Sequence, residues 1–319
     1  MTAPTPLRPA AGGAVGGATQ AGSDTGRHAR SRRRAALTGW LFIFPVIFGI
    51  LAFQIGPIFV SLFASFTNWD ALTPPMVTGV KNYVNLASDK LFLQTLRNTL
   101  LFVLGAIPLT VVIALALAVL LQARGLRGRA FFRTAYFTPY VTSSVAIGLV
   151  WFQLLAPHGI LNDGLSKIGI QGPAWLSDTT WAMPAVIIVA VWQGIGYPMV
   201  ILLAGLQTID ETLYEAARLD RASSWRQFWS ITLPLLTPQL FFVLITQFIA
   251  SFQIFTIIFV MTKGGPGNAT NVIIYYLYQN AFTFGRLGYA SAMAWFLFVV
   301  IGLVTFIQWR VQKRWVFYG

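Results

Sequence analysis

Residues 227–262 read QFWSITLPLLTPQLFFVLITQFIASFQIFTIIFVMT, a run of 36 residues without a charge. A helix that crosses a bilayer needs about 20 mostly apolar residues, so this run is long enough to span one. Five further uncharged runs of 23 residues or more lie at 35–69, 98–123, 134–162, 179–209 and 287–309. The sequence therefore predicts an all-α membrane protein with six transmembrane helices.

The composition of the whole chain agrees with this class. Of its 319 residues, 56% are hydrophobic and 10% are charged, whereas soluble domains carry about 25% charged residues. The formal net charge of +13 could suggest nucleic acid, but the basic residues are spread over several loops instead of one patch. A soluble globule and a nucleic-acid partner are therefore disfavoured, and the absence of cysteine excludes a disulfide framework.

The positions of Lys and Arg orient the helices, because positively charged segments resist translocation. The N-terminal tail, the second and fourth loops and the C-terminus hold 16 of them, and the other three loops hold 6. Both termini are therefore expected in the cytoplasm. A seventh uncharged stretch, 264–285, opens with GGPG and is expected to be an outer loop with an interfacial helix. Its Tyr275, Tyr276 and Tyr278 suit the headgroup level.

The chain is expected to have two parts. Residues 1–35, rich in Ala, Gly, Thr and Pro, have too few hydrophobic residues to pack and should form a disordered basic cytoplasmic tail. Residues 36–319 should form the six-helix transmembrane domain, which includes a cytoplasmic segment, 208–238. The first helix follows Arg residues, but its uncharged run is too long for a signal peptide, which favours an uncleaved helix.

Ionisable side chains are missing from the predicted spans. All nine acids and both histidines lie outside them, whereas carriers coupled to protons or sodium commonly place such groups at mid-membrane. Intramembrane catalysis needs an activated nucleophile or a metal, and no lysine completes a phosphate-binding Gly-Lys-Ser/Thr loop. We therefore expect no enzyme activity, no metal and no cofactor, with any ATP bound by partner subunits. A stand-alone secondary carrier of small polar solutes stays as the alternative, since backbone carbonyls can bind sodium.

The segment 208–238 is unusual for a connector because it holds four acids and several aromatic residues. Thr208 and Glu211 predict a capping box that starts a short helix ending near Leu219. Ser224 and Gln227 predict a second helix that ends before Pro234. The pattern indicates a helix-turn-helix between the fourth and fifth spans.

The second of these helices carries an aromatic stripe. Trp225, Phe228 and Trp229 follow the i, i+3, i+4 spacing of one helix face. Aromatic side chains in a loop at the cytoplasmic surface need a partner surface. That surface would be either the ends of this protein's own helices or another subunit.

The residue string EAARLDRA at 215–222, followed eight residues later by ITLP at 231–234, resembles the EAA loop of permease subunits of binding-protein-dependent ABC importers. The resemblance implies that the segment forms coupling helices that dock on a cytoplasmic ATPase. The residues expected to couple to the ATPase are Glu211, Glu215, Ala216, Ala217, Asp220, Arg221, Trp225, Phe228 and Pro234.

Arg221 departs from the family pattern, which usually has glycine there. Glycine adopts left-handed backbone conformations freely, whereas a residue with a side chain loses about 1 kcal/mol there. The turn at Arg221 is therefore expected either to avoid positive φ or to be strained. Replacement of Arg221 by glycine should be tolerated for transport.

Shorter segments extend the resemblance to the carbohydrate-type permeases of maltose, multiple-sugar and glycerol-3-phosphate importers. They include the run FIFPVIFGILAFQIGPIFVSLFASFTNWD at 42–70, GGP at 264–266 and GYASA at 288–292. The resemblance implies a multi-pass protein of the plasma (inner) membrane that moves a sugar or related carbohydrate by alternating access. It also implies a second homologous permease subunit, two ATPase subunits that bind the ATP, and an extracytoplasmic solute-binding protein as partners.

Polar residues inside the spans suggest where such a solute would pass. Gln193 and Tyr197 share one helix face beside a Gly-Ile-Gly break, as do Gln247 and Ser251 in the next span, with Gln253 nearby. Polar side chains at membrane depth usually face the bundle interior. These five residues are the expected substrate pathway, and hydrogen bonding between helices is the alternative role.

Overall fold

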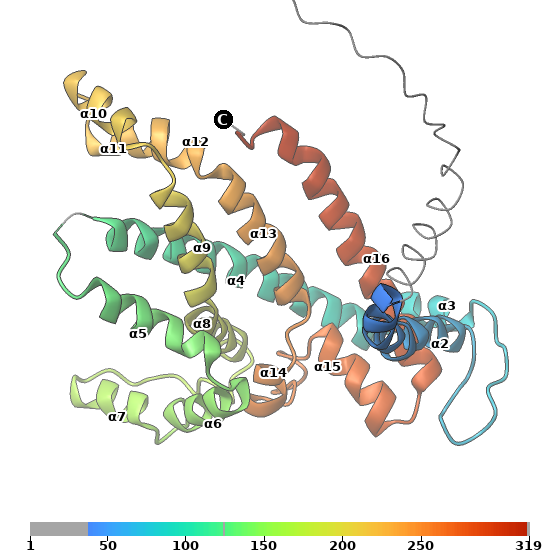
Figure 1. Ribbon diagram of the computed structural model, residues 1–319. Coiled ribbons are helices and arrows are strands. Elements are labelled where there is room, and N and C mark those ends of the chain that lie inside the picture. The colour runs from blue at the N-terminus through green and yellow to red at the C-terminus, as the bar shows by residue number, and fades with distance from the viewer. Residues whose placement is uncertain (1–37, 124, 318–319) are drawn as a thin grey trace, which may run out of the picture. The chain divides into compact units, whose positions relative to one another are not determined.

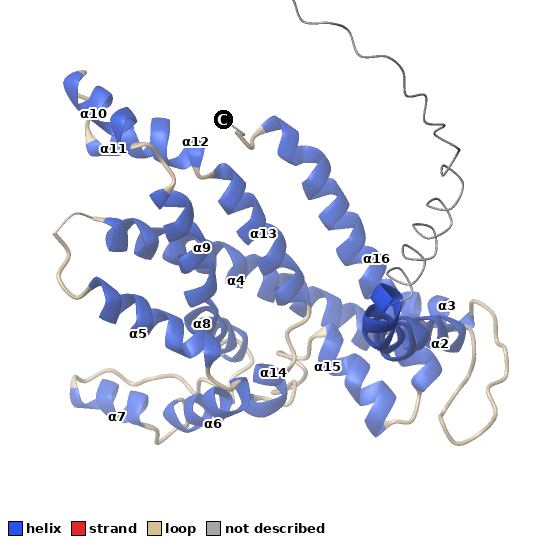
Figure 2. Cartoon of the chain, in the orientation of Figure 1, coloured by secondary structure: helices blue, strands red, loops and turns tan. Residues whose placement is uncertain are grey.

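A computed structural model describes residues 38–123 and 125–317 (Figure 1). Figure 2 shows helices joined by loops, and within the described ranges the β-structure is limited to one isolated bridge between Thr67 and Val77. The prediction of an all-α protein is confirmed. The expected disordered tail, residues 1–35, lies outside the described ranges.

The chain divides into two units, residues 1–60 and 61–319. The described part of the first unit belongs to one helical span, Thr38–Ser65, which is 28 residues long. A π-helical turn, η1 (Leu51–Ile55), interrupts it before α2 (Gly56–Ser65). This helix is long and apolar enough to cross a membrane, as the run at 35–69 predicts.

The second unit contains the remaining helices. In chain order they are α3 (Lys81–Ser88), α4 (Lys90–Gln122), α5 (Arg129–Val141), α6 (Ser144–Leu154), α7 (Ile160–Lys167), α8 (Ala182–Gly194), α9 (Gly196–Gln207), α10 (Glu211–Leu219), α11 (Ser224–Gln227), η2 (Phe228–Thr232), α12 (Leu233–Leu235), α13 (Thr237–Phe252), α14 (Thr256–Met261), α15 (Ile273–Tyr278), η3 (Gln279–Thr283), α16 (Leu287–Val311) and η4 (Gln312–Arg314).

Four helical segments and two bent pairs account for the six predicted spans among the described residues. The four segments are Thr38–Ser65, Lys90–Gln122, Thr237–Met261 and Leu287–Arg314. The third predicted span is the pair α5 and α6, bent by 98°, and the fourth is the pair α8 and α9, bent by 46°. The sequence predicts the number of spans but not the sharp bend in the third.

Local sequence explains both breaks. α5 carries Pro139 in its last turn, where proline weakens the helix, and it ends at Val141, before Thr142, whose backbone is extended. α8 and α9 meet at Ile195, between Gly194 and Gly196, the break that the sequence predicts.

Several helices extend beyond the uncharged runs into charged sequence. The second span begins at Lys90 and includes Arg97, which the sequence assigns to a loop. The third begins at Arg129 and includes Arg133. Long basic side chains near helix ends can bury their methylenes and keep their charge in water. The position of a charged residue in the sequence therefore locates the end of a span only to within about two or three helical turns.

The core of the second unit is built around α4, which packs against α8, α9 and α13 (Figure 1). Ala114 and Ala118 of α4 are fully buried against Met199 and Leu202 of α9. Small residues allow helix backbones to approach closely in membranes. α4 therefore fixes the positions of the helices that carry the predicted pathway residues.

The loop 264–285 contains a short helix, α15, as expected, but two of its three tyrosines do not face outward, and only Tyr278 is half-exposed. Tyr275 and Tyr276 are each 6% exposed, so the protein covers them instead of presenting them to headgroups. The Tyr276 hydroxyl donates to Asp89 Oδ2 at 2.8 Å, and the Tyr289 hydroxyl donates to the same oxygen at 2.7 Å. The half-buried Asp89 carboxylate thus holds Tyr276 and Tyr289 inward and joins α4, α15 and α16.

Candidate functional site

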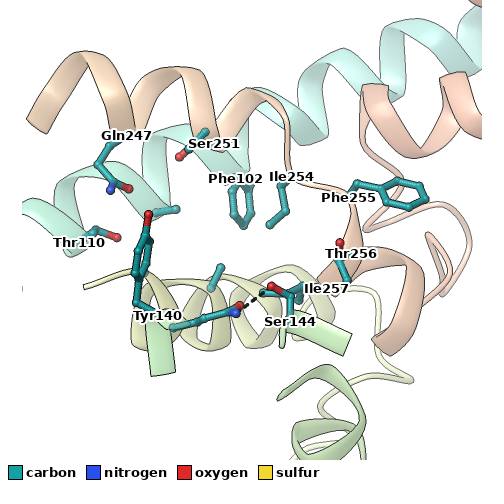
Figure 3. A pocket seen from close by; sticks show the side chains of 15 residues that line it. Phe102, Thr110, Tyr140, Ser144, Gln247, Ser251, Ile254, Phe255, Thr256 and Ile257 are labelled. Carbon is teal, nitrogen blue, oxygen red and sulfur yellow. Dashed lines mark hydrogen bonds between the residues drawn. The ribbon is translucent and has the colours of Figure 1, made fainter. Parts of the chain in front are cut away.

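A cavity of about 310 Å³ lies between the spans of the second unit. In Figure 3, Gln247 and Ser251 of α13 point into it from one side, and Tyr140 of α5 points into it from the other. Residues of α4, α6, α8 and α14 complete the lining, and none of the lining residues is charged. The cavity offers amides, hydroxyls and aromatic rings, which suits a neutral polar solute.

Three of the five predicted pathway residues meet in this cavity: Gln193, Gln247 and Ser251. The Gln193 Nε2 donates to Ser144 Oγ at 2.8 Å, and this bond joins α8 to the N-terminal turn of α6 (Figure 3). Gln193 therefore makes a helix-to-helix hydrogen bond while it lines the cavity. Of the two roles that the sequence leaves open, the structure shows the hydrogen bond between helices, and the place of Gln193 in the lining is compatible with the pathway role.

The other two predicted pathway residues are not part of the lining. The Tyr197 ring stacks on Tyr140, with centroids 5.3 Å apart and planes 18° apart, so it lies behind a lining residue. Gln253 follows the last turn of α13 and is exposed. Gln253 lies two positions after Ser251, and residues two apart in a helix do not share a face.

Sequence reasoning missed four polar lining residues, Thr110, Tyr140, Ser144 and Thr256. Thr110 is a buried polar residue two positions after Pro108 in α4, Tyr140 and Ser144 flank the break between α5 and α6, and Thr256 begins α14. Interruptions of membrane helices commonly lie beside cavities. The proline residues and paired hydroxyl residues inside the uncharged runs could have predicted these interruptions, and with them the missed lining residues beside them.

The segment 208–238 forms two helical limbs. The first limb is α10, and the second runs from α11 through η2 and α12 into α13 (Figure 1). The predicted helix-turn-helix is present, but both predicted caps are wrong. Asp210, not Thr208, caps α10 by accepting from Thr212 N at 2.9 Å, and this backbone bond lowers the pKa of Asp210. Ser223, not Ser224, caps α11.

The structure also explains why Thr208 does not cap α10 and why the second helix does not end before Pro234. The Thr208 hydroxyl donates to the carbonyl of Gly205 at 2.8 Å, so it is used at the end of α9 and not at the start of α10. The second limb does not end before Pro234, because helical backbone continues through it into Leu235. Proline needs no amide partner at the start of a helix, and Pro234 lies in the first turn of α12.

Arg221 occupies a left-handed position with φ of 56°. Its amide donates to the carbonyl of Arg218 at 3.0 Å, and the Ala222 amide donates to the carbonyl of Ala217 at 2.9 Å. These two bonds define a Schellman motif, in which the left-handed residue is usually glycine. Of the two outcomes open from sequence, positive φ is the one found.

The residues expected to couple to an ATPase are mostly solvent-exposed in this chain. No residue of α10 is buried, and Trp225 and Trp229 are 71% and 51% exposed. The rings of Trp225 and Phe228 each contact Trp229, with centroids 5.5 Å and 5.4 Å away. The aromatic stripe is therefore a surface cluster whose members pack on each other and leave area for a partner.

The sequence matches known transport proteins over almost its full length. The family model of the binding-protein-dependent transport system inner membrane component matches residues 106–317. The probable ABC transporter permease protein YesP of Bacillus subtilis (strain 168) is 38% identical over 302 residues, which cover 93% of this chain and 97% of YesP. The lactose transport system permease protein LacF of Rhizobium radiobacter is 35% identical over 288 residues, covering 89% and 96%.

Solved structures share the fold. A chain of a bacterial ABC transporter involved in the import of the acidic polysaccharide alginate matches with a TM-score of 0.77 at 24% identity, over 90% of this chain and 99% of that one. A chain of the alginate transporter in complex with an alginate pentasaccharide-bound periplasmic protein matches with a TM-score of 0.76 at 23% identity, over 89% and 96%. The match of the family model and these relatives show that the chain belongs to the family of binding-protein-dependent transport system inner membrane components, which are transport permeases and not enzymes.

Proposed function

We propose that this permease moves a sugar or related carbohydrate across the inner membrane by alternating access, driven by separate ATPase subunits. The uncharged polar cavity is the observation that carries the proposal. A neutral solute with many hydroxyl groups can replace its bonds to water with bonds to Gln247, Ser251 and Tyr140 without burying a charge. Several relatives, including LacF, are named for sugar transport.

The solute path is proposed to pass Gln193, Gln247 and Ser251, with Tyr140 as an aromatic face supported by Tyr197. Aromatic rings pack on the apolar faces of other groups and keep a polar tip available for hydrogen bonds. The family membership disfavours a stand-alone secondary carrier, and the uncharged lining gives no group that would bind a proton.

The energy is proposed to enter through the segment 208–238. Glu211, Glu215 and Asp220 are exposed on or beside α10, and Trp225 is exposed on the second limb. An exposed mixture of acids and aromatic rings is suited to docking in a cleft of another subunit. Ala216, Ala217, Arg221, Phe228 and Pro234 would shape that surface, with both chain termini on the same cytoplasmic side.

The proposed partners are a second homologous permease subunit, two ATPase subunits and an extracytoplasmic solute-binding protein. The alginate transporter, whose structure includes a periplasmic protein loaded with a pentasaccharide, supports the last of these. Affinity purification of the tagged chain from its own membranes should recover an ATPase pair and a sibling permease. Recovery of the chain alone, with ATP-independent uptake, would overturn the proposal.

The solute path is tested by Gln247→Ala in the reconstituted transporter. A lost neutral hydrogen bond is worth about 1 kcal/mol, so the uptake efficiency for a neutral oligosaccharide should fall about fivefold. Thr246→Val is the matched control, since Thr246 bonds carbonyls of its own helix at 3.0 Å and is not part of the cavity lining. Equal uptake kinetics in Gln247→Ala, Gln193→Ala and the wild type would contradict the path.

A further inference from the structure

A hydrogen bond joins the two limbs of the segment 208–238 near the base of α13. The hydroxyls of Tyr214, in the middle of α10, and Thr232, at the end of η2, lie 2.9 Å apart. Thr232 is 7% exposed, and Tyr214 is half-buried. A buried hydroxyl without a partner is unfavourable, so this bond has a physical reason to persist.

Little else packs between α10 and the rest of the permease. α10 buries none of its residues, and a cavity of about 600 Å³ lies beside Tyr214 and Thr232. The ends of α4 and α9 line the same cavity through Gln122 and Leu206. Because none of its residues is buried, α10 gains little from apolar packing, and the directional bond of Tyr214 contributes to setting its position.

The π-helical turn places Thr232 where Tyr214 can reach it. η2 spans Phe228–Thr232, and π-turns inside helices often occur at functional sites. The Thr232 hydroxyl lies 3.5 Å from the carbonyl of Gln227, so the bond within its own turn is at the limit of length. Of the two hydrogen bonds of the Thr232 hydroxyl, the one to Tyr214 is therefore the shorter.

We propose that Tyr214 and Thr232 are positioning residues whose hydrogen bond transmits the displacement of α10 to α13. The chain itself already transmits that displacement to α9. This inference rests on the proposed function, in which an ATPase moves α10. Residues 208–210 connect α10 directly to α9, whereas the path along the chain to α13 passes through a turn and three short helices. The bond connects α10 to the end of η2, from which the helical backbone continues through α12 into α13, and so makes the fourth and fifth spans move together.

The experiment measures solute uptake and ATP hydrolysis in the same proteoliposomes, with the full transporter and its loaded binding protein. The informative variants are Tyr214→Phe and Thr232→Val, which each remove one hydroxyl and keep the shape, and the double variant. Thr232→Ser is the conservative variant that keeps the hydroxyl. Tyr83→Phe is the matched control, because it removes a tyrosine hydroxyl that bonds Ser65, remote in sequence from both limbs.

Each single variant is expected to lower uptake per ATP hydrolysed about fivefold, the shift that one ordinary hydrogen bond gives to an equilibrium. The double variant should equal either single variant, because all three remove the same bond. Thr232→Ser and Tyr83→Phe should retain the wild-type ratio. A purely structural role would instead lower the amount of assembled transporter and both rates together.

An unchanged ratio in both single variants would overturn the inference, as would a double variant whose loss is the product of the two single losses. These outcomes are separate from a failure of the proposed function. If the wild type shows no ATP-dependent uptake, the proposed function fails. If the wild type transports and Tyr214→Phe keeps the full ratio, only the role of the bond fails.

Discussion

Replacing Arg221 with glycine should stabilise the turn between α10 and α11. Arg221 has φ of 56°, which a residue with a Cβ adopts at a cost of about 1–2 kcal/mol. Glycine avoids this cost but loses more backbone entropy on ordering, so the net gain is about 1 kcal/mol. The turn's two hydrogen bonds need no side chain at this position and stay intact.

Hydrogen exchange of the purified protein in lipid nanodiscs measures this gain locally. The amide of Ala222, bonded to Ala217 at 2.9 Å, should exchange about fivefold more slowly in Arg221→Gly. Arg221→Ala keeps the Cβ and should show no slowing. Arg218→Gly, which places glycine inside α10, should exchange faster because glycine costs about 1 kcal/mol there.

ATP-driven uptake by Arg221→Gly should remain near the wild-type rate, because the exposed Arg221 side chain is not needed for the turn. Exchange in Arg221→Gly as fast as in the wild type would refute the assignment of strain. Slowing of the same size in Arg221→Ala would refute it as well. A large loss of uptake with slowed exchange would instead show that the Arg221 side chain makes a contact needed for transport.

Two further predictions concern stability. Gly196→Ala should lower the free energy of unfolding by about 1–3 kcal/mol in thermal denaturation. The reason is that a Cβ added at Gly196 would lie 2.7 Å from the carbonyl oxygen of Tyr136. Gly194→Ala is the control, because a Cβ added there meets nothing within 4 Å. Equal stability of Gly196→Ala and Gly194→Ala would contradict the close approach of α5 and α9. Asp89→Asn should destabilise the protein by about 1–2 kcal/mol at pH 7, because two tyrosine hydroxyls donate to the carboxylate. Burial opposes ionisation of Asp89, but these hydroxyls and two backbone amides outweigh it and hold the pKa of Asp89 below its ordinary 3.8. The carboxylate's contribution to the free energy of unfolding is therefore full above pH 3.8 and is lost as the pH falls through the lowered pKa. A difference between Asp89→Asn and the wild type that fades already between pH 7 and 5 would be inconsistent with that pKa.

The sequence predicts the helical spans well because their signal is length and the absence of charge, and both are properties of one segment. The break at Ile195 could be predicted for the same reason, since its two flanking glycines are local. The helix caps depend on competition between neighbours. Asp210 and Thr208 both have side chains that can cap, and only the end of α9 decides which of them caps α10.

The candidate site could be predicted only in part. Gln247 and Ser251 were found because they are polar residues four apart in one apolar helix. Tyr140 and Ser144 were missed because they reach the cavity through a 98° bend that the sequence signals only by proline and hydroxyl residues. Gln253 was included for its closeness in sequence to Ser251, although residues two apart in a helix do not share a face.

Uptake of a radiolabelled neutral oligosaccharide into proteoliposomes tests the central claim most directly. The transporter would be reconstituted with its sibling permease, its ATPase pair and its loaded binding protein. Uptake should require ATP on the cytoplasmic side, which is the interior of the vesicle. It should be unchanged when proton and sodium gradients are collapsed. Uptake that continues without ATP and stops when either gradient is collapsed would contradict the account.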